Sequence, residues 1–77
     1  MLIYKLYKFE SDLILYQYYS QLNDAGLISV NRKTGEITVI RQSDDDIGGR
    51  MANKLAMRLK DFYAENAYKE AGTIAWY

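Results

Sequence analysis

Residues 43–66, SDDDIGGRMANKLAMRLKDFYAEN, predict one long amphipathic helix around which the rest of the chain is organised. Ser43 is typical of a helix start, because its hydroxyl can accept a hydrogen bond from an unpaired backbone N–H of the first turn. The three aspartates that follow would complement the positive end of the helix dipole. At about 100° per residue, the large apolar side chains share one half of the helix: Ile47, Met51, Leu55, Leu59, Phe62 and Tyr63. We expect this face to pack on a sheet.

Two glycines, Gly48 and Gly49, stand just inside the predicted start and weaken the helix by about 1 kcal/mol each relative to alanine. They suit a frayed first turn or tight packing. Glycines at a helix start can also hold a phosphate, but the aspartates at 44–46 would repel it. A divalent cation is disfavoured too, because contiguous carboxylates lack the alternating spacing of a calcium loop. We predict no metal site and no cofactor.

The residues before the helix are patterned as strands and turns. Residues 2–9 and 13–19 are rich in aliphatic and aromatic side chains, and the polar residues 10–12 between them predict a turn. A short helix over residues 13–22 is the alternative for the second segment. Residues 27–30 and 36–41 predict another hairpin, in which Asn31 and Gly35 suit a type I turn with a G1 bulge. Residues 21–26 are expected to form the turn that joins the two hairpins.

The residues after the helix are less clearly patterned. The helix is expected to end near Asn66, and residues 67–72 fit no single element. Residues 73–77 could extend along a sheet edge or pack beneath the helix, and we expect Trp76 to be held against the domain. The order is therefore β-β-β-β-α, with room for a short C-terminal strand. This order predicts a single α+β domain over residues 1–77, with a four-stranded antiparallel sheet and one long amphipathic helix on one face.

The composition excludes several function classes. The 77 residues include no cysteine and no histidine, which removes disulfides, thiolate metal sites and the usual general base at neutral pH. The chain has no phosphate-binding loop and no dinucleotide fingerprint, and no spacing unites its carboxylates, lysines and tyrosines into a catalytic group. We therefore expect a protein that is not an enzyme. Because no apolar run approaches a membrane span and no signal peptide is recognisable, we expect a cytoplasmic protein without a membrane partner.

Eight tyrosines in so short a chain are the outstanding feature of the composition. The first two predicted strands carry apolar or aromatic side chains on both faces, and one helix shelters only one face. We therefore expect an exposed aromatic patch, which on a small domain usually marks a contact surface. The residues proposed for this interaction face are Tyr4, Tyr7, Tyr16, Tyr18 and Tyr19. The simplest partner is a second copy, packed sheet to sheet or edge to edge as a homodimer. A different protein, or a C-terminal segment that covers the patch, is the alternative.

Nucleic acid is the partner expected from a different class of function. Ten basic and ten acidic residues give a formal net charge of zero, so no overall attraction to phosphate exists. Arg50, Lys54 and Arg58 nevertheless recur every four residues on the exposed side of the predicted helix. They could contact phosphates together with Arg32 and Lys33 at the hairpin tip. The plainer alternative is a solvated helix face with local ion pairs and a well-made turn.

Overall fold

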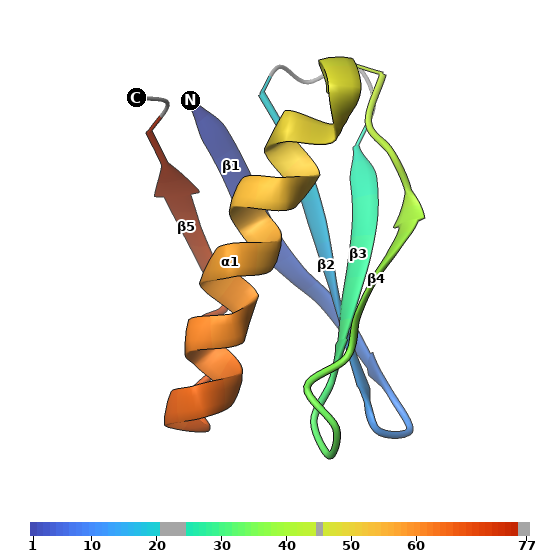
Figure 1. Cartoon of the computed structure of the whole chain (residues 1–77), viewed down its shortest axis with the longest axis vertical. Coiled ribbons are helices and arrows are strands. Elements are labelled where there is room, and N and C mark those ends of the chain that lie inside the picture. Colours follow the sequence, from blue (N-terminus) through green and yellow to red (C-terminus); the bar gives the residue numbers. More distant parts are fainter. Residues whose placement is uncertain (21–24, 45, 76–77) are drawn as a thin grey trace.

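The computed structural model describes residues 1–20, 25–44 and 46–75, which form a five-stranded antiparallel sheet and one helix (Figure 1). The strands are β1 (Leu2–Glu10), β2 (Leu13–Tyr19), β3 (Gly26–Asn31), β4 (Ile37–Arg41) and β5 (Ala71–Ile74). A 3-10 turn, η1 (Ile47–Gly49), leads into the helix α1 (Arg50–Glu65). The predicted α+β class is confirmed, with one helix on the sheet and a short C-terminal strand.

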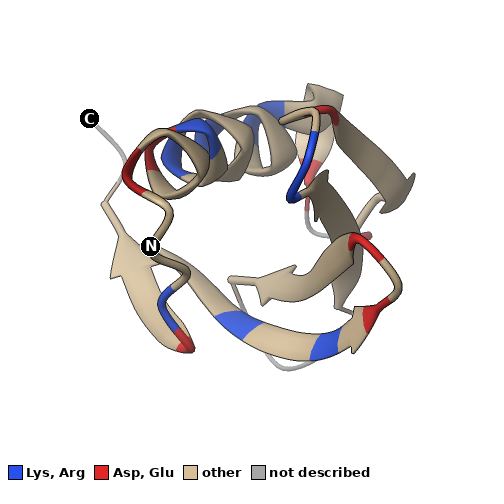
Figure 2. Ribbon diagram, turned by 90° about the horizontal axis from the view of Figure 1, so that it is seen from below, with Lys and Arg blue, Asp and Glu red and all other residues tan. Residues whose placement is uncertain are grey.

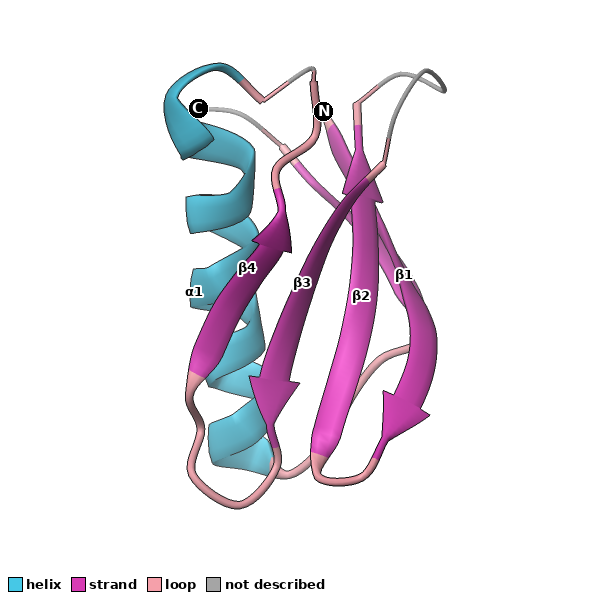
Figure 3. Ribbon diagram, turned by 90° about the vertical axis from the view of Figure 1, so that its right-hand side faces the viewer, coloured by secondary structure: helices cyan, strands magenta, loops and turns pink. Residues whose placement is uncertain are grey.

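The strand order is β4-β3-β2-β1-β5, and all neighbouring strands are antiparallel. The first four strands follow one another in the sheet as they do in the chain. Figures 1 and 3 show α1 lying across one face of the sheet. In the chain it follows β4 and precedes β5. Because β5 pairs with β1, the N-terminal strand is internal and β4 and β5 are the two edge strands of the described sheet.

The sheet curves around α1. Figure 2 shows the strands bending around the side on which the helix lies. One local cause is a β-bulge in β1, where the pairing with β2 shifts between Leu6 and Lys8 and leaves Tyr7 as the extra residue. Bulges increase the local twist and bend the strand. The concave face therefore lies close to α1 over several strands, which lets one helix cover a wide part of the sheet.

The core lies between this concave face and α1. Alternate residues of β1, β2 and β3 point toward the helix, since successive side chains of a strand lie on opposite faces. The buried cluster contains Leu2, Tyr4, Ile14, Tyr16, Tyr18, Ile28, Val30, Met51, Ala52, Leu55, Leu59 and Phe62. Four of the six large apolar residues predicted for the buried helix face belong to this cluster. Ile47 and Tyr63 do not. Ile47 lies in η1 and is exposed, and Tyr63 lies at the margin of the helix face.

Aromatic rings occupy the centre of this core. The centroids of Tyr4 and Tyr16 lie 5.9 Å apart in an edge-to-face arrangement. Phe62 of α1 lies 6.1 Å from Tyr4 and 6.2 Å from Tyr16. Tyr68, in the connection after α1, stands edge-on to Phe62 at 6.4 Å. Such tilted and edge-on pairs are favoured by the ring quadrupoles, so they add to the area that the rings bury.

The start of α1 differs from the prediction. The helix begins at Arg50 and not beside Ser43, because Gly48 and Gly49 have φ angles of 72° and 74°. These left-handed conformations cost glycine little, and they turn the chain before the regular helix begins. The serine and aspartates at residues 43–46 resemble a conventional cap, which is why the predicted helix began too early.

A buried carboxylate caps α1 from outside the helix. Asp46 Oδ1 accepts a hydrogen bond from the N–H of Met51 at 2.8 Å, and Oδ2 accepts one from the N–H of Ala52 at 3.1 Å. The hydroxyl of Tyr18 donates to the same Oδ2 at 3.1 Å. That hydroxyl also accepts from the N–H of Ser43 at 3.2 Å. The network fixes the first turn of the helix to the middle of the sheet.

The end of α1 agrees with the prediction. Asn66 is left-handed, with a φ of 52°, and its N–H bonds to carbonyl oxygens of the last turn. The N–H of Ala67 then donates to the carbonyl of Phe62 at 3.0 Å. These bonds satisfy carbonyls that the last turn leaves without helical partners.

The turn between β3 and β4 uses Asn31 and Gly35, the two residues that the sequence indicated, but it is one residue longer than a type I turn with a G1 bulge, because the N–H of Gly35 donates to the carbonyl of Asn31 at 2.8 Å. Asn31 Oδ1 accepts hydrogen bonds from the N–H groups of Lys33 at 2.8 Å and Thr34 at 3.1 Å. Gly35 has a φ of 79°. A Cβ at Gly35 would lie 2.8 Å from the ring of Tyr63 on α1. The hairpin tip therefore packs directly against the last turns of the helix.

The remaining expectations concern short segments. Residues 13–19 form β2, so the alternative of a helix over residues 13–22 is wrong for this part of the chain. Most of the predicted turn at residues 21–26 lies outside the described residues, as does Trp76. In the part of the chain that the structure describes, no helix is both long and apolar enough to cross a membrane.

Candidate interaction surfaces

Three of the five tyrosines predicted for an interaction face lie inside the protein. Tyr4, Tyr16 and Tyr18 lie beneath α1 and have almost no exposed surface. Tyr4 pairs with Tyr18, and Tyr16 lies on the same face of β2 two residues earlier. The expectation that one helix leaves these side chains uncovered is therefore corrected, because register and curvature bring all three to the concave face. They cannot contact a partner in this conformation.

Glycines make room for two of these rings. Gly26 of β3 pairs with Tyr18, and Gly72 of β5 pairs with Tyr4. A Cβ on Gly26 would overlap the Tyr18 ring, and a Cβ on Gly72 would overlap the Tyr4 hydroxyl. An aromatic ring set over a strand glycine covers backbone that would otherwise be poorly packed. Both tyrosines are thus part of the sheet's own packing.

The hydroxyls of two of the buried tyrosines, Tyr16 and Tyr18, have hydrogen-bond partners within the chain. The hydroxyl of Tyr16 donates to the backbone carbonyl of Lys69 at 2.7 Å. Burial raises the pKa of Tyr16 above its ordinary value of 10.0, and Tyr4 and Tyr68 act in the same direction. Burial also raises the pKa of Tyr18, against the opposing effect of the hydrogen bond from the Ser43 N–H. These phenols are held neutral, which suits packing better than proton transfer.

The other two predicted face residues lie on different parts of β1 and β2. Tyr7 is 52% exposed at the β1 bulge, and the Lys8 ammonium lies 5.8 Å from its ring centroid. Tyr19 pairs with Ile3 on the convex face and is half-buried. The five tyrosines therefore do not form one exposed face.

An exposed apolar surface lies instead on β4. Residues 37–40, named the β4 edge below, are Ile, Thr, Val and Ile and carry no charge. Val39 is 46% exposed and Ile40 is 50% exposed. Ile40 is the extra residue at an irregularity in the pairing with β3. The sequence contained a signal for this surface, because residues 37–40 of the second hairpin carry no charge. Only the strand order shows that these residues lie on an edge strand.

The two cations predicted at the hairpin tip are engaged with neighbouring residues. The Arg32 guanidinium lies 6.0 Å from the ring centroid of Phe9, a cation–π arrangement. Lys33 Nζ lies 3.8 Å from Asp12 Oδ2. Both contacts join the tip to the neighbouring β1–β2 hairpin and so serve to hold the two hairpins together.

The cationic row of α1 lies on another side of the molecule. Arg50, Lys54 and Arg58 follow the flank of α1 that turns away from the hairpin tip. The tip contacts Tyr63, whose hydroxyl donates to the backbone carbonyl of Lys33 at 3.2 Å. At 3.6 residues per turn, Arg58 and Tyr63 point about 140° apart around the helix. The structure therefore does not bring the two predicted groups of cations together, and Figure 2 shows basic and acidic segments interspersed.

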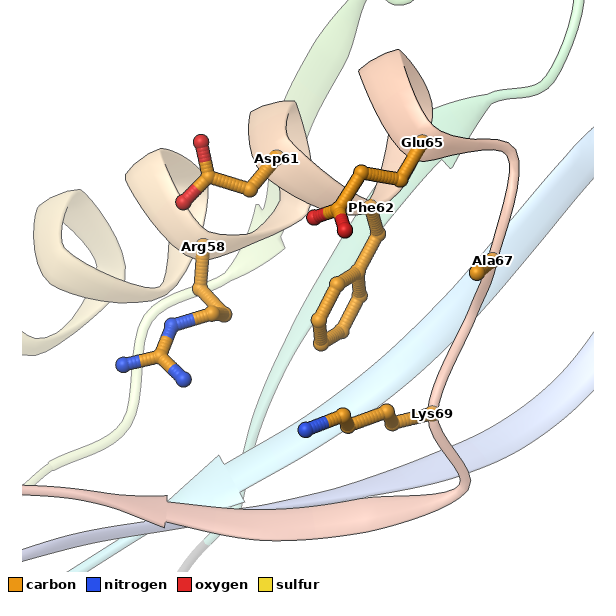
Figure 4. Close-up of a pocket in the computed structure, with 6 residues that line it drawn as sticks. All are labelled: Arg58, Asp61, Phe62, Glu65, Ala67 and Lys69. Atoms are coloured by element: carbon orange, nitrogen blue, oxygen red, sulfur yellow. The ribbon is translucent and has the colours of Figure 1, made fainter.

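A depression lies between the second half of α1 and the connection to β5 (Figure 4). Its volume is about 290 Å³. Charged side chains surround an aromatic floor, and the lining residues are Arg58, Asp61, Phe62, Glu65, Ala67 and Lys69. Phe62 is 4% exposed, so its ring forms the base while the charged groups form the rim. We name this the Phe62 depression; it was not predicted, because its two sides come from different elements.

The sequence raised two further hypotheses for the helix start, a phosphate site and a metal site. A phosphate would need the first-turn N–H groups, but Asp46 already accepts hydrogen bonds from Met51 and Ala52. Among residues 1–20, 25–44 and 46–75, no cluster of three or more carboxylates could hold a metal ion.

Comparison with protein-family models found no match, and neither did comparison with curated proteins or with solved structures.

Proposed function

We propose that this protein is a small, non-enzymatic interaction domain that self-associates edge to edge through β4. The β4 edge carries this proposal, because an outer strand presents a row of backbone N–H and C=O groups that can pair with another strand. Proteins usually protect such strands with lysine, proline or inward charges. Here residues 37–40 offer only apolar side chains and one threonine, with Val39 and Ile40 about half exposed.

A second copy of the chain is the partner that fits this edge. Glu36 precedes the apolar run and Arg41 ends it, so the strand has opposite charges at its two ends. Antiparallel pairing of two β4 strands about a two-fold axis brings each charge near the opposite charge of the partner copy. The same pairing shelters Val39 and Ile40 and joins the two sheets into one. The formal net charge of zero leaves no long-range repulsion between copies.

The proposed contact uses the edge of β4, whereas the sequence predicted a tyrosine-rich face of the sheet. Two strands separate β4 from β1, so exposed Tyr7 lies far across the sheet from the β4 edge. Self-association through β4 therefore leaves Tyr7 and the Phe62 depression uncovered. The partner remains a second copy, as the composition led us to expect, but the surface is different.

Sedimentation of charge-altered variants tests the proposal. We expect a reversible dimer of the native chain at micromolar concentration, and a monomer for Val39→Lys, because each copy would then carry an unpaired lysine into the apolar contact. Met57→Lys is the matched control, since Met57 is 62% exposed on the outward side of α1. Ile40→Lys is a second edge variant in case Val39→Lys disturbs the fold.

A dimer that persists in both edge variants contradicts the proposal, and so does a native chain that stays monomeric up to millimolar concentration. Loss of the dimer in Met57→Lys alone would show that the interface lies on the outer surface of α1, and would also contradict the proposal. Circular dichroism of each variant separates loss of association from loss of fold.

Nucleic-acid binding stays a prediction of the sequence. The separate positions of the Arg50 row and the Arg32 tip do not favour it. Electrostatic affinity is strongest at low salt, so no binding of mixed-sequence DNA or RNA at about 50 mM salt would end this alternative.

A further inference from the structure

We propose that the free side of β5 accepts an extended acidic peptide, which adds as a further strand and places a carboxylate in the Phe62 depression. This site is at the opposite end of the sheet from the β4 edge. It therefore goes beyond the proposed dimer and does not depend on it. Strand addition of this kind takes affinity from main-chain hydrogen bonds and specificity from a side-chain pocket.

The backbone of β5 is suited to strand addition. β5 pairs with β1 on one side only, within the described residues, so its other side is a sheet edge. Its sequence, Ala71–Ile74, contains no charge and no proline. Ala71 and Gly72 have small side chains, which lets another backbone approach closely. The strand is short, at four residues, and it places no lysine, proline or inward charge in the way of an incoming strand.

The Phe62 depression supplies a recognition pocket next to this edge. Lys69 stands two residues before β5, and the connection that carries it continues into β5 in Figure 4. In the same view, Arg58 extends from α1 toward the space that Lys69 also enters. Within the described residues, no ion pair engages either side chain. Two cations from separate elements thus converge on one open space beside an edge strand.

The charges of the depression favour a peptide carboxylate over a larger anion. Asp61 and Glu65 also line the depression, and Figure 4 shows their carboxylates on the α1 side of the Phe62 ring. A nucleic-acid backbone would bring several phosphates close to these two carboxylates and meet repulsion. A peptide held by its main chain along β5 can direct a single carboxylate to Arg58 and Lys69. Charge-assisted hydrogen bonds at such a point are among the stronger ones in proteins.

Fluorescence anisotropy with defined peptides tests the proposal. The probe is a short fluorescein-labelled peptide of threonine and valine with a single central aspartate, titrated with the full chain. Its partner probes replace aspartate by lysine or carry N-methyl groups on alternate residues, which removes main-chain donors. We expect binding of the aspartate peptide alone. Arg58→Glu and Lys69→Glu should each weaken it about tenfold or more, whereas Lys60→Glu, on the exposed outer side of α1, should not.

Several results would overturn the proposal. They are no binding of the aspartate peptide, equal binding of the lysine peptide, and binding that N-methylation or Lys69→Glu leaves unchanged. Lys69 is exposed, so its substitution reports on the site even if Arg58→Glu disturbs the fold. The titration is repeated with Val39→Lys, which is designed to be monomeric. Retained binding there separates this site from the dimer, and binding lost there shows that the site depends on association and contradicts the proposal.

Discussion

Single residues on the concave face show how closely this small core is packed. Tyr18 is fully buried, its ring lies against Gly26, and its hydroxyl bonds to Asp46. The ring cannot easily move aside, because hydrogen bonds hold its hydroxyl and the neighbouring strand lies against the same end of the ring. The sequence indicated neither the role of Gly26 nor that of Tyr18, since both follow from the pairing of β2 with β3.

Gly26→Ala should therefore destabilise the protein by about 1–3 kcal/mol, the usual cost of forcing extra volume into a packed core. The measurement is the free energy of unfolding in urea. Thr73→Ala is the control, because Thr73 is exposed on the same sheet. An equal effect of the two substitutions would contradict the packing of Tyr18 against Gly26.

Alkaline pH should unfold the protein through its buried phenols. Burial raises the pKa of Tyr16 and of Tyr18 in the folded state above the ordinary value of 10.0. The unfolded chain then loses these protons first, so the stabilisation is fully present below pH 10 and is lost as pH rises above it. Each such tyrosine lowers the free energy of unfolding by up to about 1.4 kcal/mol per pH unit there.

Phenolate absorbance and urea unfolding, followed together, measure this dependence. Tyr16→Phe should flatten the fall in stability above pH 10, since it removes one of the titrating groups. A variant with the same alkaline slope as the native chain would show that Tyr16 is not shielded.

At the scale of elements, local turn chemistry could be predicted and distant contacts could not. The Asn31–Gly35 turn and the end of α1 near Asn66 follow from residues adjacent in sequence. The start of α1 does not, because Asp46 is held by Tyr18, 28 residues away. The aspartate that caps the helix was within the predicted cap, but its role required a partner from β2.

The glycines of the turns offer a matched pair of substitutions. Gly35 and Gly48 have φ angles of 79° and 72°, so alanine is strained at both, by about 1 kcal/mol. A Cβ at Gly35 would also meet Tyr63 at 2.8 Å, whereas nothing lies within 4 Å of one at Gly48. Gly35→Ala should therefore cost more stability than Gly48→Ala in thermal or urea unfolding. Equal costs would mean that the hairpin tip does not pack against α1.

For the whole molecule, the sheet order and curvature decide which surface is free. The α+β class and the strand content could be predicted from composition and periodicity. The covered face could not, because it depends on the register of β1 with β2 and on the bulge at Tyr7. With Tyr4, Tyr16 and Tyr18 under α1, Val39 and Ile40 are the large apolar side chains that are exposed on an edge strand of the described sheet.

Hydrogen exchange of the native chain at low and high protein concentration tests the β4 contact most directly. Outward N–H groups of β4 gain partners only when two copies pair, whereas those of β5 do not. We predict that exchange in Ile37–Arg41 slows as concentration rises, while exchange in Ala71–Ile74 stays the same. Exchange in β4 that is independent of concentration, in samples that sedimentation shows to be associated, would contradict self-association through this edge.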